Sequence, residues 1–281
     1  MTLSGACFLP ITDDEFNRIR NLIYDRVGIS LSHQKKGLLV SRLQGMMRNM
    51  GLSTFSEYYK YILEDQTGQA VIDLVNRIST NFTYFLREKA HFDFLTNVVF
   101  AQITSLLNTQ NSRDIRVWCA GCSTGEEAYS LMILMMEYFG DRYALWDIGL
   151  LATDISANAL KKAKAGIYSP EQIKSLPKHI VLKYFSQTHD QQWQVVNRVR
   201  AEVIFRSFNL VNPVFPFKKP FHIIFCRNVM IYFDKPTRDT LIKKYYNFTL
   251  PGGYLFIGHS ESIDRSLTSY QYVMPAVYRR E

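Results

Sequence analysis

Apolar side chains in the first 90 or so residues recur every three or four positions, and this spacing predicts helices. The first run follows Thr12 and Glu15, which have the spacing of a capping box, and Gly28 ends it. The same pattern predicts further helices over residues 32–50, 54–63 and 69–79. No strand-like alternation interrupts this part, so we expect an all-helical N-terminal domain over residues 1–90.

The pattern changes after about His91, where a linking helix over residues 91–107 leads into strands that alternate with helices. Short apolar runs predict strands over residues 115–119, 147–153, 221–226, 254–258 and, as the last candidate, 272–278. Helices are expected over residues 126–139, 156–165 and 235–250. This alternation is typical of a mostly parallel, doubly wound sheet, so we expect an α/β domain over residues 91–281.

One stretch, about 168–206, fits this alternation poorly. A polar segment over 186–194 leads into residues 193–199, whose polar and apolar positions alternate as in a hairpin strand. We therefore expect a small antiparallel β subdomain to be inserted into the α/β domain here.

The chain is basic, with a net charge of +8 and a pI of about 9.2, so it favours an acidic partner: nucleic acid, an anionic membrane or an acidic protein surface. Between Asp25 and Glu57 there is no acidic residue. Within that span lie Lys35, Lys36, Arg42 and Arg48. The charge pattern alone allows either a solvated basic face or a docking surface for an acidic partner.

No apolar run approaches the roughly 20 residues that span a bilayer, and residues 1–10 lack the pattern of a secretory signal. We therefore expect a cytoplasmic protein without membrane insertion. Cys119 and Cys122 form a C-x-x-C pair, but no second pair completes a zinc site. Together with Cys7 and Cys226 they are expected to be reduced thiols, and no metal is expected.

The loop after the first predicted strand carries the most chemical information. Gly121 and Gly125 would let the backbone approach a ligand closely, but the spacing lacks the dinucleotide fingerprint and no phosphate-binding G-K-[ST] occurs. The second strand ends at Asp154, which can accept hydrogen bonds from ribose hydroxyls or cap the next helix. The two features together favour a nucleoside ligand without a diphosphate, and S-adenosylmethionine fits this description.

Four segments of the chain are informative together: residues 81–87 (NFTYFLR), 118–127 (WCAGCSTGEE), 225–233 (FCRNVMIYF) and 258–261 (GHSE). With these four segments in this order, the chain resembles the CheR family of receptor methyltransferases over nearly its whole length. The resemblance implies a Rossmann-like class I methyltransferase sheet that binds S-adenosylmethionine and releases S-adenosylhomocysteine. It also implies that the methyl acceptors are glutamate side chains on the cytoplasmic helical bundle of a methyl-accepting chemoreceptor.

The resemblance further implies roles for individual residues. Arg87 would orient the incoming glutamate beside the methyl donor, and Tyr232 would lie near the sulfonium. Glu127 would contact the methionine end of the cofactor and Asp154 its ribose. Further contacts with the cofactor pocket are implied for Asn81, Thr83, Asn209, Leu210, Arg227, Asn228, His259 and Ser260. From the residues alone, Arg87 could instead pair with a surface carboxylate, Tyr232 could belong to the core, and His259 could be structural.

The chemistry needs no general base, because a glutamate with a reference pKa of about 4.3 is already ionised at neutral pH. Catalysis would then depend on positioning the two reactants. In this family the N-terminal helices dock on the receptor, which gives Lys35, Lys36 and Arg42 a docking role. The predicted hairpin lacks the glycine-containing loop with which some members grip a receptor peptide, so we expect a tether-independent enzyme, with a monomer as the default.

Two rival functions stay open at this point. A nucleic-acid methyltransferase would agree with the basic charge, but the segment after the fourth strand (CRNVM) does not suit a base amine, so no nucleic-acid partner is expected. A non-catalytic adaptor that binds S-adenosylmethionine would need only part of the site. The presence of Arg87, Glu127, Asp154 and Tyr232 together argues against it.

Overall fold

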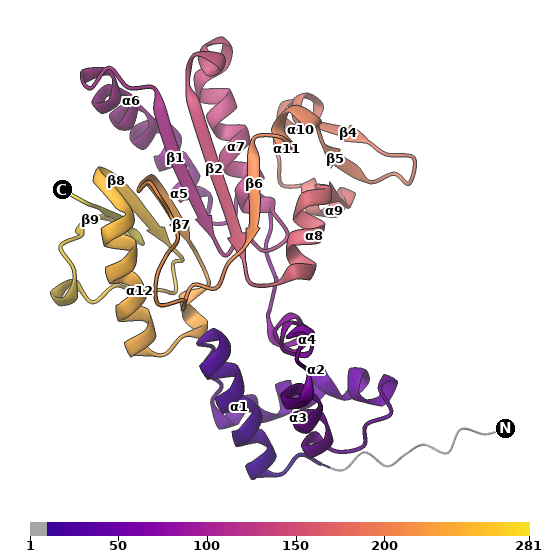
Figure 1. Ribbon diagram of the computed structural model, residues 1–281. Helices are drawn as coiled ribbons and strands as arrows, with labels where there is room; N and C mark the ends of the chain where they lie inside the picture. Colours follow the sequence, from indigo (N-terminus) through magenta and orange to yellow (C-terminus); the bar gives the residue numbers. More distant parts are fainter. Residues whose placement is uncertain (1–9) are drawn as a thin grey trace. The chain divides into compact units, whose positions relative to one another are not determined.

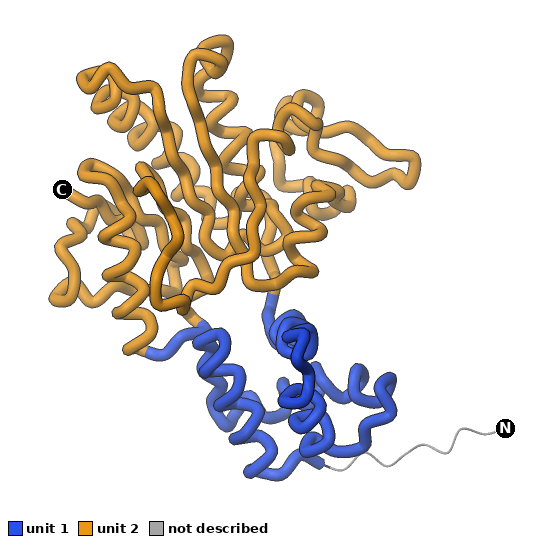
Figure 2. Tube along the Cα trace, viewed as in Figure 1, with its two compact units in different colours: residues 1–80, 232–234 blue, residues 81–231, 235–281 orange. Residues whose placement is uncertain are grey.

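The computed structural model describes residues 10–281, which form two compact units (Figure 2). The first contains the chain up to Thr80 together with Tyr232–Asp234, and the second contains Asn81–Ile231 and Lys235–Glu281. The units divide at residue 80, whereas the sequence analysis placed the boundary at about 90. No described helix is both long enough and apolar enough to cross a membrane.

The described part of the first unit is helical, as predicted (Figure 1). Its elements are α1 (Asp13–Val27), η1 (His33–Lys35), α2 (Lys36–Asn49), α3 (Phe55–Glu64) and α4 (Gln69–Ile78). The predicted capping box is present at α1: the Thr12 hydroxyl accepts from the Glu15 amide, and the Glu15 carboxylate accepts from the Thr12 amide. Gly28 ends α1 in left-handed backbone, with φ 71°.

The apolar faces of these helices form their own core. Phe16 and Ile19 of α1, Leu43 of α2, Phe55 of α3 and Leu74 of α4 are all almost completely buried. Burying side chains of this size contributes about 1.5–3 kcal/mol each, so the helices are held mainly by one another.

A short segment from far along the chain completes this unit. The Ser30 amide donates to the carbonyl of Tyr232 at 2.8 Å, Ile29 forms an isolated antiparallel bridge with Phe233, and the Tyr24 hydroxyl donates to Asp234. The residue that the sequence assigned to the methyl-transfer site, Tyr232, is therefore paired through its backbone with the helical unit.

The second unit is built on a seven-stranded sheet of order β6-β2-β1-β7-β8-β10-β9 (Figure 1). The strands are β1 (Asp114–Ala120), β2 (Asp147–Asp154), β6 (Val203–Ser207), β7 (Phe221–Cys226), β8 (Thr249–Ile257), β9 (Gln271–Met274) and β10 (Val277–Arg279). The pairs among the first five are parallel, and β10 is antiparallel to β8 and β9. The predicted mostly parallel sheet is confirmed.

Helices connect the strands and pack against the sheet. They include α5 (Lys89–Phe94), the π-helical segment η2 (Leu95–Val99), α6 (Phe100–Thr109), α7 (Glu126–Phe139), α8 (Ala157–Ala165) and α12 (Lys235–Phe248). The predicted linking helix over 91–107 is thus one run interrupted by a π-helical segment. Because α7 packs against β2 and β6, and α12 against β8, the sheet is buried along its centre.

Two expectations near the C-terminus were wrong. The strand expected over 254–258 begins earlier, because β8 starts at Thr249 and residues 251–253 lie inside it. The expected single strand over 272–278 is instead the hairpin of β9 and β10. The two residues between these strands form the turn: Pro275 lacks an amide hydrogen for strand pairing, and Ala276 has a positive φ of 63°.

A small antiparallel sheet interrupts the alternation, as the sequence predicted. Its order is β3 (Ile167–Tyr168), β5 (Trp193–Val195), β4 (Phe185–Gln187), accompanied by α9 (Pro170–Ile173), α10 (Lys178–Tyr184) and α11 (Asn197–Arg200). Residues 203–206, included in the predicted insert, belong to β6 of the large sheet, where Val203 pairs with Leu150. The predicted strand over 193–199 ends at Val195, because α11 begins at Asn197.

A buried tryptophan joins the first two strands of the large sheet. The Trp118 indole nitrogen donates to the Thr153 hydroxyl at 2.9 Å, and both side chains are essentially inaccessible to solvent. Aromatic rings surround the indole, with centroids 4.7–6.0 Å away: Phe208, Phe215, Phe217, Phe221 and Tyr245. No water can replace a lost acceptor in such surroundings.

Replacing Thr153 with valine therefore tests this core. The change keeps the side-chain shape but leaves the Trp118 N–H without its acceptor, which is expected to lower the free energy of unfolding by about 1–3 kcal/mol. Urea denaturation measures the change. Thr240→Val is the matched control, because its hydroxyl lies on the exposed surface of α12. Equal stability of the two variants would contradict a stabilising role for the hydrogen bond between Trp118 and Thr153.

Candidate active site

The loop between β1 and α7 is fastened to the end of β2. The amides of Gly121 and Cys122 both donate to the Thr153 carbonyl, at 2.7 and 2.9 Å. Gly121 has φ 91°, and a Cβ at this position would lie 2.3 Å from a methyl group of Val229. Only glycine fits this backbone and this contact, so the loop lies close against the segment that follows β7.

Asp154 connects the same loop to the start of α8. Its two carboxylate oxygens accept from the Ser123 amide and from the Ser156 amide, both at 2.8 Å. Ser156, as predicted, is the N-cap of α8, with its hydroxyl accepting from the Ala159 amide. Burial raises the pKa of Asp154, although the two amide hydrogen bonds act in the opposite direction.

Two other predicted cofactor segments lie beside this acid. The Ser123 hydroxyl donates to the Asn81 carbonyl at 3.0 Å, and residues Asn81 and Thr83 line a pocket of about 360 Å³ that also includes Lys162. On the other side of the acid, the Phe208 amide donates to the Asp154 backbone carbonyl. Asn209 and Leu210 follow at once, so the structure brings these predicted residues together at the ends of β1, β2 and β6.

Arg227, immediately after β7, is the charged centre of the site. It is 4% exposed, and its two terminal nitrogens lie 3.1 Å from the carboxylates of Glu88 and Glu127. The same guanidinium donates to the backbone carbonyl of Arg87 and lies 5.3 Å from the ring of Phe92. A buried cation is thus compensated by two carboxylates.

The two carboxylates respond differently to this environment. Burial raises the pKa of Glu127, in the first turn of α7, although the Arg227 charge opposes the shift. Burial also acts to raise the pKa of Glu88, but the charges of Arg227, His259 and His91 and the hydrogen bond from Asn228 together outweigh it, so the pKa is lowered. Glu127 additionally accepts from the Cys119 thiol at 3.3 Å.

A further buried acid, Glu261, connects the ends of β7 and β8. Its carboxylate accepts from the amides of Asn228, Gly258 and Ile231 at 3.0, 2.6 and 3.2 Å. Asn228 has φ 58° and is held in this conformation by the contact. The sequence analysis assigned His259 and Ser260 to the pocket border but gave Glu261 no role, although it lies in the same GHSE segment.

Arg87 lies between two residues in left-handed backbone, Leu86 and Glu88, with φ 56° and 57°. Its guanidinium donates to the Phe82 carbonyl at 3.1 Å and lies 5.9 Å from the rings of Phe82 and Tyr84. Among residues 10–281, no carboxylate lies within 4 Å of it, so the alternative of a surface ion pair is not observed. Its charge is available for an anionic group.

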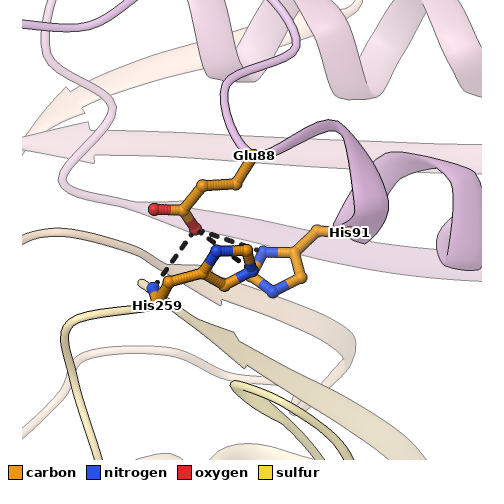
Figure 3. Close-up of side chains that lie close together, drawn as sticks. All are labelled: Glu88, His91 and His259. Carbon is orange, nitrogen blue, oxygen red and sulfur yellow. Dashed lines mark hydrogen bonds and ion pairs between the residues drawn. The ribbon is translucent and has the colours of Figure 1, made fainter.

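A carboxylate and two imidazoles meet next to Arg87 (Figure 3). The Glu88 carboxylate points toward His91 of α5, with Oε2 3.5 Å from Nδ1, and toward His259 beyond β8, with Oε2 4.0 Å from Nε2. Burial, with the nearby Arg227 charge, lowers the pKa of His91 to about 4. These are donor types that bind transition metals, but Arg227 already supplies a positive charge to the same Glu88 oxygen.

Two of the three predicted docking residues, Lys36 and Arg42, have partners within the first unit. Lys36 forms an exposed ion pair with Asp13 at 2.7 Å, and Arg42 donates to the Arg77 and Ser79 carbonyls at the C-terminus of α4. No carboxylate of the described chain lies within 4 Å of Lys35. The docking role stays a prediction. Arg42 also stabilises the C-terminus of α4 through these hydrogen bonds.

The described cysteines are buried thiols. Cys119, Cys122 and Cys226 are free, and burial raises the pKa of each. Cys7 lies outside the described residues.

Comparisons with known proteins match both units of the chain. The family model described as the all-alpha domain of CheR methyltransferases matches residues 14–79, and that of their SAM-binding domain matches residues 81–278. A chemotaxis protein methyltransferase of Borreliella burgdorferi is 43% identical over 97% of this chain and 96% of its own length. Those of Escherichia coli and Salmonella typhimurium are 34% and 33% identical, over 90% and 96% of this chain and 86% and 91% of their own lengths. The chain belongs to the CheR family of chemotaxis methyltransferases.

Proposed function

We propose that this protein transfers a methyl group from S-adenosylmethionine to glutamate side chains of chemoreceptors and so forms methyl esters. The observation that carries the proposal is the grouping of Glu127, Asp154 and Arg227 at neighbouring strand ends. Arg87, whose backbone carbonyl accepts from Arg227, adds a charge that pairs with no described carboxylate. Family membership over both units supports the same reaction.

The residues fit the cofactor chemically. Glu127 and Asp154 are partly buried carboxylates whose oxygens keep lone pairs beyond the contacts described, so they can accept from an ammonium group and from ribose hydroxyls. Leu210, which is 7% exposed, offers apolar surface beside them for a purine ring. When bound, the sulfonium cofactor supplies an electrophilic methyl group.

The acceptor step follows from the charges. Arg87 would hold the glutamate carboxylate through a two-pronged contact, which guanidinium groups favour. A carboxylate oxygen then forms a bond to the methyl carbon as the carbon–sulfur bond breaks, and no proton is transferred. The rate enhancement comes from alignment of the two reactants, because the carboxylate nucleophile is already ionised. Tyr232 is proposed to border the sulfonium.

The helical unit is proposed to dock on the cytoplasmic helical bundle of the receptor, with Lys35 and Lys36 facing acidic side chains. An acid-free stretch of 31 residues, 26–56, would favour such a surface electrostatically. We further propose that the enzyme is a monomer and acts in the cytoplasm. We also propose that it needs no peptide tether on the receptor, since the β4–β5 connection, residues 188–192, contains no glycine.

The proposal is tested by incubating the protein and S-adenosylmethionine with the cytoplasmic fragment of a chemoreceptor from the same host, followed by mass spectrometry of its peptides. One added methyl group on glutamate side chains is expected. Methylated lysine or arginine, or preferential methylation of added RNA, would overturn the assignment and favour a rival function. Cofactor binding without transfer to any receptor fragment of the host would favour an adaptor.

Arg87→Ala is expected to lower turnover by about 100-fold, because the acceptor loses its alignment. Affinity for S-adenosylhomocysteine, measured by calorimetry, is expected to change much less. Arg87→Lys keeps the charge but loses the fork, so it should be intermediate. Full turnover by the alanine variant would rule out this role.

Lys35→Glu is expected to weaken receptor methylation about fivefold at low salt, with less effect at high salt, because an attractive charge becomes a repulsive one. Lys36→Glu should act in the same direction. The control is Lys60→Glu, which makes the same charge change on α3 of the same unit. Arg42 is unsuitable here because its loss would disturb α4. Equal effects of Lys35→Glu and Lys60→Glu would contradict a local docking surface.

A further inference from the structure

Glu88 has no assigned role in the reaction, yet more contacts converge on it than a surface acid would make. Its side chain is 15% exposed, and its carboxylate lies 3.1 Å from Arg227, 3.5 Å from His91 and 3.4 Å from the Asn228 amide group. The backbone amide of His259 also donates to it. It therefore contacts the segments that follow β7 and β8 as well as its own.

The contact with Arg227 leads directly to the predicted acceptor-binding residue. One terminal nitrogen of Arg227 approaches the Glu88 carboxylate and also donates to the backbone carbonyl of Arg87. One guanidinium nitrogen thus contacts both the carbonyl of the Arg87–Glu88 peptide and the Glu88 side chain. Because Leu86 and Glu88 both have positive φ, this turn is unfavourable by itself and needs such support.

The same guanidinium also pairs with Glu127. Arg227 has one positive charge, and Glu88 and Glu127 lie at equal distances of 3.1 Å from it. Two partly buried carboxylates that share one cation carry a net negative charge, which a cationic ligand can balance. Without Glu88, the Arg227 charge would be available to Glu127 alone.

We propose that Glu88 is a positioning residue: through Arg227 it fixes the turn that presents Arg87 and keeps Glu127 only partly neutralised for the ammonium group of the cofactor. This inference depends on the proposed function. A metal ion between Glu88, His91 and His259 is the alternative for this cluster, but the ion would have to share the carboxylate oxygen that Arg227 approaches.

The test is a double-mutant cycle with Glu88→Gln and Arg227→Gln, read through kcat, the KM for receptor and the calorimetric affinity for S-adenosylhomocysteine. Glu88→Gln is expected to lower kcat/KM at least about tenfold and to weaken product affinity. The double variant is expected to be no less active than Arg227→Gln, because Glu88 acts through Arg227. The proposal would be overturned if the losses in kcat/KM of the two single variants multiplied in the double variant. It would also be overturned if kcat/KM of Glu88→Gln stayed within about twofold of the parent protein.

Further measurements keep the test decisive. If Arg227→Gln does not fold, Arg227→Lys replaces it in the cycle, since lysine cannot hold two carboxylates and a carbonyl at once. Asp93→Asn is the control: it removes an acid one turn away, in an exposed pair with Lys89, and should stay within about twofold. Loss of activity on treatment of the parent protein with a chelator would support a metal and overturn the proposal. A parent protein that esterifies no receptor would instead refute the proposed function.

Discussion

The site depends on keeping one buried guanidinium between two carboxylates. Arg227 is enclosed, and removing either Glu88 or Glu127 would leave buried charge poorly compensated, which is far more costly than losing a surface ion pair. The three residues come from the turn before α5, the start of α7 and the end of β7, so these elements must stay in register for the charges to stay paired.

The sheet supplies that register. Parallel pairing aligns the carboxyl ends of β1, β2 and β7, and the loop glycine Gly121 lets the chain pass against Val229 without a clash. Asp154 and Glu261 then use their carboxylates to tie neighbouring loops through backbone amides. The loops at these strand ends are therefore held mostly by partly or fully buried acids, which agrees with a cationic cofactor in the proposed function.

Local patterns were sufficient for much of the fold and for part of the site. The Thr12 capping box and the alternation of strands and helices follow from spacing alone, and both are present. The partners of Arg227 do not follow from any local pattern, because Glu88 is distant in sequence and adjacent only through the fold. The same is true of Arg42, whose basic character indicated docking but whose hydrogen bonds reach the end of α4. Glu261 was overlooked because its role is to accept backbone amides, which residue type does not reveal.

If the methyl acceptor is a carboxylate, the product is an ester, and the lability of that ester to alkali tests the proposed function most directly. Membranes containing the chemoreceptors of the host are incubated with the protein and methyl-labelled S-adenosylmethionine, and the labelled protein is then treated with mild alkali. Label is expected to enter the receptor and to be released as methanol, as a carboxyl methyl ester requires. Label that enters the receptor and resists alkali would contradict the proposed function, because the methyl group would then be on another kind of acceptor.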